Sequence, residues 1–302
     1  MTFVVAEEVA STLAAGGPVV ALETSVIGQG LPHPQNVECV ERMAAAIAAS
    51  GALAAWIGLV DGRVVVGLSG PQLIRFATSG EATKVARRDV PMALATRALG
   101  ATTVSATIWA AHRAQISIAA TGGIGGVHPG ARTDVSADLF ELACTPVLLV
   151  CSGPKSIVDP VLTAEKLEEL GVGIVGYGVN RLPWFLVRAS SVELEHRVDT
   201  PAEAAALAAA QRVSGTAGAV VMCNPVPAAD AMDGDEVTEA ARRAEATMEA
   251  AGVTGKDVTP YLLAALANET GGRSLVANLA LLEDNARVAA QIAVALSGAR
   301  SG

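Results

Sequence analysis

The chain has 302 residues, of which 51% are hydrophobic and 17% charged, so it contains ample apolar material for a folded core. Its formal net charge of −9 argues against a nucleic-acid surface, because binding a phosphate backbone requires clustered lysine and arginine. No uncharged apolar run reaches the roughly 18 residues that a membrane-spanning helix needs. We therefore expect neither a nucleic acid nor a membrane as partner.

The first 17 residues carry acidic side chains and no basic region ahead of their apolar part, which is not the pattern of a secretory signal peptide. This predicts a cytoplasmic protein. The cysteines Cys39, Cys144, Cys151 and Cys223 lack the spacing of a metal-binding knuckle, so we expect four reduced thiols in the core.

The first elements in chain order are a short helix over residues 4–15 and a buried strand over residues 18–22, followed by a helix over residues 36–50. The strand delivers Glu23 at its end, next to a polar loop punctuated by glycines. A carboxylate in this place has two interpretations. It is either a helix cap or solvated strand end, or a general acid.

A hairpin follows, because residues 54–59 and 63–68 flank Asp61-Gly62. The residues from 74 to 89 are expected to form a polar connection that contains Lys84 and two arginines. These cations are either a solvated face or the densest positive spot available to a phosphate. Helices are expected over residues 90–99 and 108–113, with a strand or loop between them.

The stretch from residue 118 to residue 159 carries most of the reactive groups. Apolar runs at 116–120 and 146–150 predict two inner strands, the first ending in a glycine-rich turn and the second in a loop that contains Lys155. Open α/β sheets bind ligands at such strand ends. Lys155 is either ion-paired to a neighbour or, if partly desolvated beside another cation, an amine nucleophile of the Schiff-base type.

Two aspartates lie between these strands, four residues apart. If their segment is helical, Asp134 and Asp138 share one helix face and could bind a divalent cation that prefers oxygen ligands. The alternative is that Asp134 caps the following helix. Spacing alone thus indicates a sugar-phosphate or aldehyde-type site with an amine nucleophile.

The remaining chain alternates between strands at residues 171–178 and 219–223 and several helices. These helices are expected over residues 161–170, 200–212, 236–251, 259–270 and 274–296. Alternation of this kind predicts a three-layer α/β/α fold with a mostly parallel sheet. No linker or repeat interrupts the pattern, so residues 1–302 are expected to form a single domain.

Ordered sequence blocks over residues 5–296 include ALETSVIGQGLPHPQN, TKVARRD, TGGIGGVHPGA, DVSADLFEL, SGPKSIVD and GKDVTPYLLAALANETGG. Together they resemble the pseudouridine-5'-phosphate glycosidase family. So many blocks in the family's order are far more specific than any one of them. The resemblance implies a compact α/β/α fold and a homotrimer.

Carried over position by position, the resemblance implies that Lys155 is the nucleophile and Glu23 the proton donor. It implies that Asp134 binds a divalent cation, usually Mn²⁺. It also implies substrate-binding positions, which are Lys84, Val104, Ser136, Ala137, Asp138 and Asn278.

Several positions depart from the family's pattern, Thr24-Ser25 and Pro154 among them, and three bear on the contacts to the substrate. Gln29 stands where a histidine is common, His33 replaces an aromatic residue, and Pro129 stands where arginine is frequent. None of them removes a matched catalytic group, but they leave the contacts to the base or the phosphate open.

The implied reaction is cleavage of the C–C glycosidic bond of pseudouridine 5'-phosphate to uracil and ribose 5-phosphate, through a covalent lysine adduct. Two other functions fit the same residues. A Schiff-base sugar-phosphate lyase or aldolase would use the same lysine and phosphate contacts. A non-catalytic nucleotide-binding protein would bind the ligand without turning it over.

Overall fold

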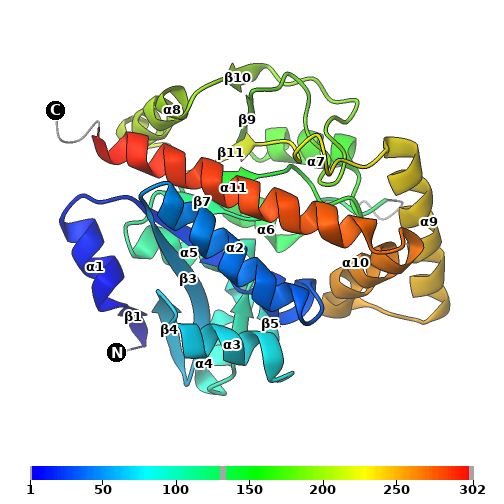
Figure 1. The fold of residues 1–302 in the computed structure, drawn as a ribbon, viewed down its shortest axis with the longest axis horizontal. Helices are drawn as coiled ribbons and strands as arrows, with labels where there is room; N and C mark the ends of the chain where they lie inside the picture. The colour runs from blue at the N-terminus through cyan, green and yellow to red at the C-terminus, as the bar shows by residue number, and fades with distance from the viewer. Residues whose placement is uncertain (1, 130–133, 299–302) are drawn as a thin grey trace.

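A computed structural model describes residues 2–129 and 134–298 of the chain. In this part of the chain, eleven strands form one sheet with helices packed on both of its faces (Figure 1). The strands are β1 (Phe3–Val5), β2 (Val19–Glu23), β3 (Leu53–Val60), β4 (Arg63–Val66), β5 (Thr83–Val85), β6 (Gly100–Thr102), β7 (Ile118–Ala120), β8 (Leu148–Cys151), β9 (Gly173–Tyr177), β10 (His196–Val198) and β11 (Val220–Cys223).

The main path of the sheet runs β1-β4-β3-β2-β7-β8-β11-β9-β10, and β6, which pairs with β5, is attached to β3. Only β3 pairs in the antiparallel sense, with β4 and with β6, among the described strands. The prediction of a mostly parallel three-layer fold is therefore confirmed. Because the central strands are parallel, the carboxyl ends of β2, β7, β8 and β11 lie side by side at one edge of the sheet.

Eleven α-helices are present in the described residues. They are α1 (Glu7–Ala14), α2 (Gln35–Ala49), α3 (Gly70–Thr78), α4 (Val90–Ala95), α5 (Val104–Arg113), α6 (Ala137–Leu142), α7 (Pro160–Glu169), α8 (Pro201–Ser214), α9 (Gly234–Ala250), α10 (Val258–Glu269) and α11 (Arg273–Gly298). Three single turns are η1 (Val26–Gly30), η2 (Arg87–Asp89) and η3 (Gly255–Asp257).

The two faces of the sheet bury two separate apolar clusters, because successive side chains of a strand point to opposite faces. In β2, Val20 and Leu22 pack in the cluster that includes α2, α8 and α11. Val19 and Ala21 pack in the cluster that includes α1, α4, α5, α6 and α7. Figure 1 shows α11 and α2 lying across one face of the sheet.

Most of the predicted long elements are confirmed within a few residues, and so is the hairpin. Its turn residues Asp61 and Gly62 have φ values of 52° and 77°, the left-handed conformation that this turn requires. The expected helix over residues 4–15 is wrong at its start, where β1 pairs with β4. The expected polar connection is also wrong, because it misses α3, which buries Leu73 and Phe76.

The four cysteines are free, but they are not all in the core. Cys39, Cys151 and Cys223 are buried, whereas Cys144 is exposed after the end of α6, so the expectation of four core thiols is wrong for that residue. Burial raises the pKa of the Cys39 thiol to about 12, which keeps it protonated and unreactive.

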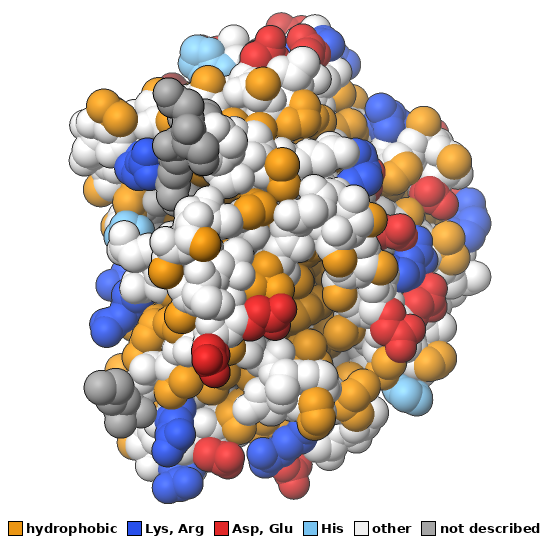
Figure 2. All heavy atoms as spheres, turned by 60° about the vertical axis from the view of Figure 1, so that its left-hand side comes forward, with side chains coloured by type: hydrophobic (Ala, Val, Ile, Leu, Met, Phe, Trp, Pro, Cys, Tyr) orange, Lys and Arg blue, Asp and Glu red, His pale blue; other side chains and the backbone are white. Residues whose placement is uncertain are grey.

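The surface carries charges of both signs. On the face drawn in Figure 2, acidic and basic side chains are interspersed among apolar ones. None of the helices in residues 2–129 and 134–298 combines the length and the apolar character needed to cross a bilayer.

Asn285 of α11 connects the ends of three parallel strands. Its buried side-chain nitrogen donates to the carbonyl oxygen of Thr121 at 2.9 Å and to the hydroxyl of Ser152 at 3.1 Å. Its side-chain oxygen accepts from Nδ2 of Asn224 at 3.0 Å. These partners follow β7, β8 and β11, so one amide on a helix holds the sheet edge that carries the loops.

We predict that Asn285→Ala lowers the free energy of unfolding by about 2–4 kcal/mol, because it leaves several buried polar groups without partners. Urea denaturation measures the change. Asn268→Ala, at an exposed position of α10, is the matched control and should change stability by less than about 0.5 kcal/mol. Equal losses in the two variants would contradict the role given to Asn285.

Candidate active site

A cavity of about 250 Å³ lies at the sheet edge where β2, β7 and β8 end. The first turns of α5, α6 and α10 and the glycine-rich turn after β7 complete its walls. The structure brings all nine predicted site residues to this one cavity, namely Glu23, Lys84, Val104, Asp134, Ser136, Ala137, Asp138, Lys155 and Asn278. Helix amino termini direct unpaired N–H groups at such a space, which favours an anionic ligand.

Glu23 is the last residue of β2 and is only 5% exposed. One carboxylate oxygen accepts a hydrogen bond from the hydroxyl of Thr121, and the other accepts from the hydroxyl of Ser25 at 2.6 Å. These two donors fix the orientation of the carboxylate at the cavity wall. No sequence pattern pointed to Thr121, which is distant along the chain, whereas Ser25 lies in the polar loop.

Lys84 and Lys155 reach the cavity from β5 and from the loop after β8. Burial, and next the positive charge of Lys155, lower the pKa of the Lys84 amine. The carboxylates of Asp138 and Glu23 oppose this shift. Two amines thus share one partly desolvated space with two carboxylates. Lys84 is the neighbouring cation that the interpretation of Lys155 as a nucleophile requires.

The loop that carries Lys155 is braced by a turn that the sequence did not reveal. The backbone N–H of Phe185 donates to the carbonyl of Ser152 at 2.8 Å, and the indole N–H of Trp184 donates to the carbonyl of Val158 at 3.1 Å. Phe185 has a φ of 53°, is buried and lines the cavity. A side chain in this uncommon conformation persists only where its surroundings hold it, so the loop is well fixed on both sides.

Asp138 is buried and serves the framework of the cavity. Its two carboxylate oxygens accept from the backbone N–H groups of Ser105 at 3.0 Å and Gly125 at 3.1 Å. A Cβ on Gly125 would lie 2.2 Å from Oγ of Ser136, so only glycine fits there. Asp138 therefore joins the start of α5 to the glycine-rich turn.

The structure corrects both interpretations that spacing gave for Asp134. Helix α6 begins at Ala137, so Asp134 precedes the helix and shares no helical face with Asp138. The residue that caps α6 is Ser136, whose hydroxyl accepts from the backbone N–H of Asp138 at 3.2 Å. The shared-face and cap hypotheses are therefore wrong, although Asp134 does line the cavity.

A cation in this cavity would depend on Asp134. No group of three or more His, Cys, Asp and Glu residues suited to a metal ion occurs in the described residues. His128 lies on the same wall, and its pKa is lowered chiefly by burial, against the charge of Asp134. Small divalent cations are often held by one carboxylate and several waters. The donor set fits a site of that kind and not an all-protein cage.

The structure also shows where Asn278, Val104 and these three departures from the family's pattern lie. The side chain of Asn278 on α11 makes no hydrogen bond within the described residues, so it is available to a ligand. Val104 is the first residue of α5. Of the departures only Gln29 lines the cavity, where its Nε2 donates to the carbonyl of Ala82 at 2.6 Å; His33 and Pro129 are exposed elsewhere.

Comparison with known proteins gives relatives over nearly the whole chain. The family described as "Indigoidine synthase A like protein" matches residues 8–295. A protein named pseudouridine-5'-phosphate glycosidase from Methylobacterium nodulans is 48% identical over 298 residues, covering 98% of this chain and 88% of the relative. One of the same name from Herpetosiphon aurantiacus is 49% identical over 295 residues, covering 97% of each.

Two solved structures share the fold. The prealnumycin C-glycosynthase AlnA, in complex with ribulose 5-phosphate, has a TM-score of 0.91 and 38% identity, covering 100% of this chain and 99% of that one. An indigoidine synthase A-like protein from Thermotoga maritima has a TM-score of 0.90 and 37% identity, covering 98% and 97%. The resemblance seen in the ordered sequence blocks is confirmed.

The charge arrangement predicts opposite shifts in the pKa of Lys84. Lys155→Met removes a positive neighbour, so the pKa of Lys84 should rise and the midpoint of its labelling by acetic anhydride should move to higher pH. Glu23→Gln removes a negative neighbour, so the midpoint should move to lower pH. Mass spectrometry reads both midpoints, with Lys166 on α7 as internal reference. Shifts in the same direction would show that these charges do not act on Lys84.

Proposed function

The chain belongs to the family of indigoidine synthase A-like proteins, and from this premise we propose that it is a glycosidase acting on pseudouridine 5'-phosphate. It cleaves the C–C glycosidic bond reversibly to uracil and ribose 5-phosphate. The observation that carries this function is the presence of Lys155 and Glu23 in one cavity with Lys84, among relatives of 45–49% identity that bear the glycosidase name.

The chemistry explains why a lysine is needed. The leaving atom of a C-glycoside is carbon, so protonation of a glycosidic oxygen, which starts ordinary glycoside hydrolysis, is not available. The nitrogen of Lys155 instead bonds to C1' of the sugar while the bond from C1' to the ring oxygen breaks and that oxygen takes a proton. The sugar is then an open chain attached to the enzyme through an amine.

Bond cleavage follows from this adduct. Glu23 donates a proton to the carbon of the base, the bond between that carbon and C1' breaks, and the nitrogen lone pair of Lys155 forms the C1'=N bond of an imine. Uracil leaves, and water hydrolyses the imine to ribose 5-phosphate and free Lys155. The hydroxyls of Thr121 and Ser25 hold Glu23 in the orientation that the transfer requires.

The phosphate of the substrate is held by positive groups of the same cavity. Lys84 and the amino-terminal turn of α5, which starts at Val104, supply charge and N–H donors. Ser136, Ala137 and Asn278 line the same cavity and complete the contacts to the substrate.

A divalent cation, Mn²⁺ or a similar ion, is part of the proposal. Asp134 would hold it, with water as the remaining ligands, and the bound ion would supply positive charge that polarises its waters. The homotrimer that the resemblance implies and the cytoplasmic location predicted from the sequence belong to the same proposal, and the mass of the particle in solution tests the first of them.

The direct test is release of free uracil from pseudouridine 5'-phosphate by the purified protein with Mn²⁺, followed by chromatography. Borohydride added during incubation with ribose 5-phosphate should fix one pentose phosphate on Lys155, seen by peptide mass. Lys155→Met should abolish both results, because the proposed nucleophile is absent. An adduct on another lysine, or uracil release by Lys155→Met, would contradict the assignment.

Glu23→Gln separates the release of uracil from the formation of the sugar adduct on Lys155 in the same assays. It should reduce uracil release by at least about 100-fold, because a general acid contributes roughly that much, while borohydride still fixes the sugar on Lys155. Release at the wild-type rate would remove Glu23 from the mechanism.

Metal binding is tested without an activity assay. Electron paramagnetic resonance should detect bound Mn²⁺, and Asp134→Asn should weaken its affinity by about tenfold or more, the amount that even an outer-shell partner can contribute. Asp235→Asn, at an exposed position of α9, is the control and should bind Mn²⁺ like the wild type. Equal affinity in the two variants would place the cation elsewhere.

A further inference from the structure

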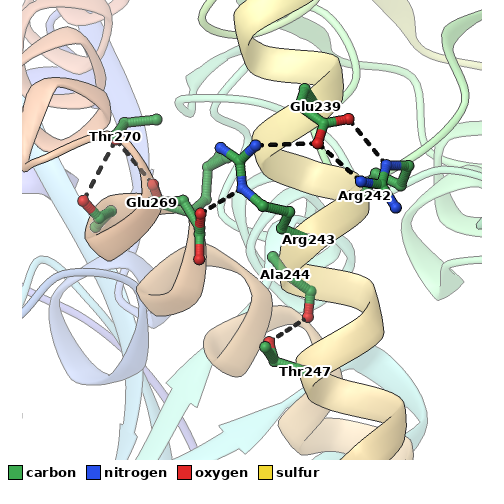
Figure 3. Close-up of polar contacts among 9 residues, drawn as sticks. Glu239, Arg242, Arg243, Ala244, Thr247, Glu269 and Thr270 are labelled. Carbon is green, nitrogen blue, oxygen red and sulfur yellow. Dashed lines mark hydrogen bonds and ion pairs between the residues drawn. The ribbon is translucent and has the colours of Figure 1, made fainter.

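Helices α9 and α10, joined through η3, form a hairpin at one end of the molecule, away from both chain termini (Figure 1). At its base, Arg273 at the start of α11 donates to Glu236 of α9 at 3.0 Å. Within it, Arg243 of α9 contacts Glu269 of α10 at 2.5 Å and Glu239 at 3.0 Å (Figure 3). The hairpin is therefore a stiff unit anchored at α11.

The tip of this hairpin is a wall of the active-site cavity. Residues of η3 and of the first turns of α10 line it, namely Gly255, Lys256, Val258, Thr259, Pro260 and Leu263. The hairpin also packs, through Ala244 and Leu262, on Ile157 and Val158, which follow Lys155 in its loop. The base of the hairpin belongs to the large apolar cluster, through Val237 and Ala240 of α9 and Leu266 of α10, whereas its outer half rests on this smaller cluster of four buried residues.

One ion pair connects the tip to the opposite wall. The ammonium group of Lys256 lies 2.9 Å from Oδ2 of Asp89 in η2 and 3.4 Å from the carbonyl oxygen of Lys84 in β5. The side chain of Asp89 is only 14% exposed, and the same oxygen accepts from the backbone N–H of Ala86 at 3.1 Å. The side chain of Lys256 is 50% exposed, so solvent screens the pair in part and Asp89 is its buried member.

The other end of the hairpin is a fixed turn. Gly271 and Gly272 connect α10 to α11 with φ values of 59° and 83°, and their N–H groups donate to the carbonyls of Asn268 at 3.2 Å and Ala267 at 2.8 Å. The outer half of the hairpin, which rests on the small cluster and on the Lys256–Asp89 pair, is therefore the part that can move relative to the opposite wall of the cavity.

We propose that Lys256 and Asp89 form a clasp that holds the α9–α10 hairpin closed over the bound sugar phosphate, which makes both of them positioning residues for the reaction. The proposal rests on the proposed function for the identity of its ligand. Closure keeps bulk water from the lysine adduct until uracil has left, and it fixes the wall that carries Lys84.

Kinetics of three variants test the clasp: Lys256→Met, Asp89→Asn and the two combined. Methionine keeps the apolar stem of the lysine, and asparagine keeps an acceptor for the N–H of Ala86. Either single variant should raise KM, and the Kd of ribose 5-phosphate measured by calorimetry, roughly threefold to tenfold, with kcat within about twofold. The double variant should be no worse than the worse single one, because the pair is already lost.

The same variants distinguish the clasp from a direct contact between Lys256 and the phosphate. A direct contact would make Lys256→Met weaken binding while Asp89→Asn leaves it unchanged or tightens it, because the cavity has lost a negative charge. Either that result or additive effects in the double variant would overturn the clasp. Arg242→Met is the matched control, since Arg242 is paired with Glu239 at 2.8 Å on the exposed face of the same hairpin (Figure 3) and should change nothing.

Hydrogen exchange of the ligand-free protein tests the clasp independently of the reaction. Backbone amides of residues 253–259 should exchange faster in Lys256→Met and in Asp89→Asn, and at the wild-type rate in Arg242→Met. If the wild type released no uracil, this result would still decide on the clasp. If exchange were unchanged while uracil was released, the clasp would be wrong and the glycosidase function would stand.

Discussion

The hydrogen bonds of Asn285 are the constraint on which the rest of the structure depends. This amide is fully buried and reaches from the long helix α11 to the chain just after β7, β8 and β11. Its partner Thr121 holds the carboxylate of Glu23, and its partner Ser152 precedes the loop of Lys155. Glu23 and the loop of Lys155 are thus positioned by strands whose ends are joined through one side chain.

The cavity that results balances charges of opposite sign in a small volume. Burial, and next the charge of Lys155, lower the pKa of Lys84, whereas the carboxylates of Asp138 and Glu23 oppose this shift. Asp138 is further stabilised by two backbone N–H groups. A bound phosphate would bring negative charge close to the two lysines, so the charges of the cavity favour an anionic ligand.

The walls of this cavity differ in how firmly they are attached to the core. The sheet and its flanking helices bury two large apolar clusters and hold Glu23 and Lys155, whereas the outer half of the α9–α10 hairpin forms a wall of the cavity through a small cluster and the Lys256–Asp89 pair. A site that must admit a nucleotide and release two products needs one wall of low local stability. The hairpin meets that need without disturbing the strands that hold Glu23 and Lys155.

The sequence by itself determined the central strands, most helices and the residues gathered at the cavity, because apolar periodicity and ordered motifs are local properties of the chain. Contacts between distant segments were decided only in the tertiary structure: Thr121 on Glu23, Trp184 on the Lys155 loop, and Lys256 on Asp89. The interpretation of Asp134 from spacing was wrong for the same reason, because the start of α6 depends on the cap that Ser136 forms in the folded chain. The spacing of residues along the sequence limits which side chains can come into contact, and the packing of distant segments decides which of them do.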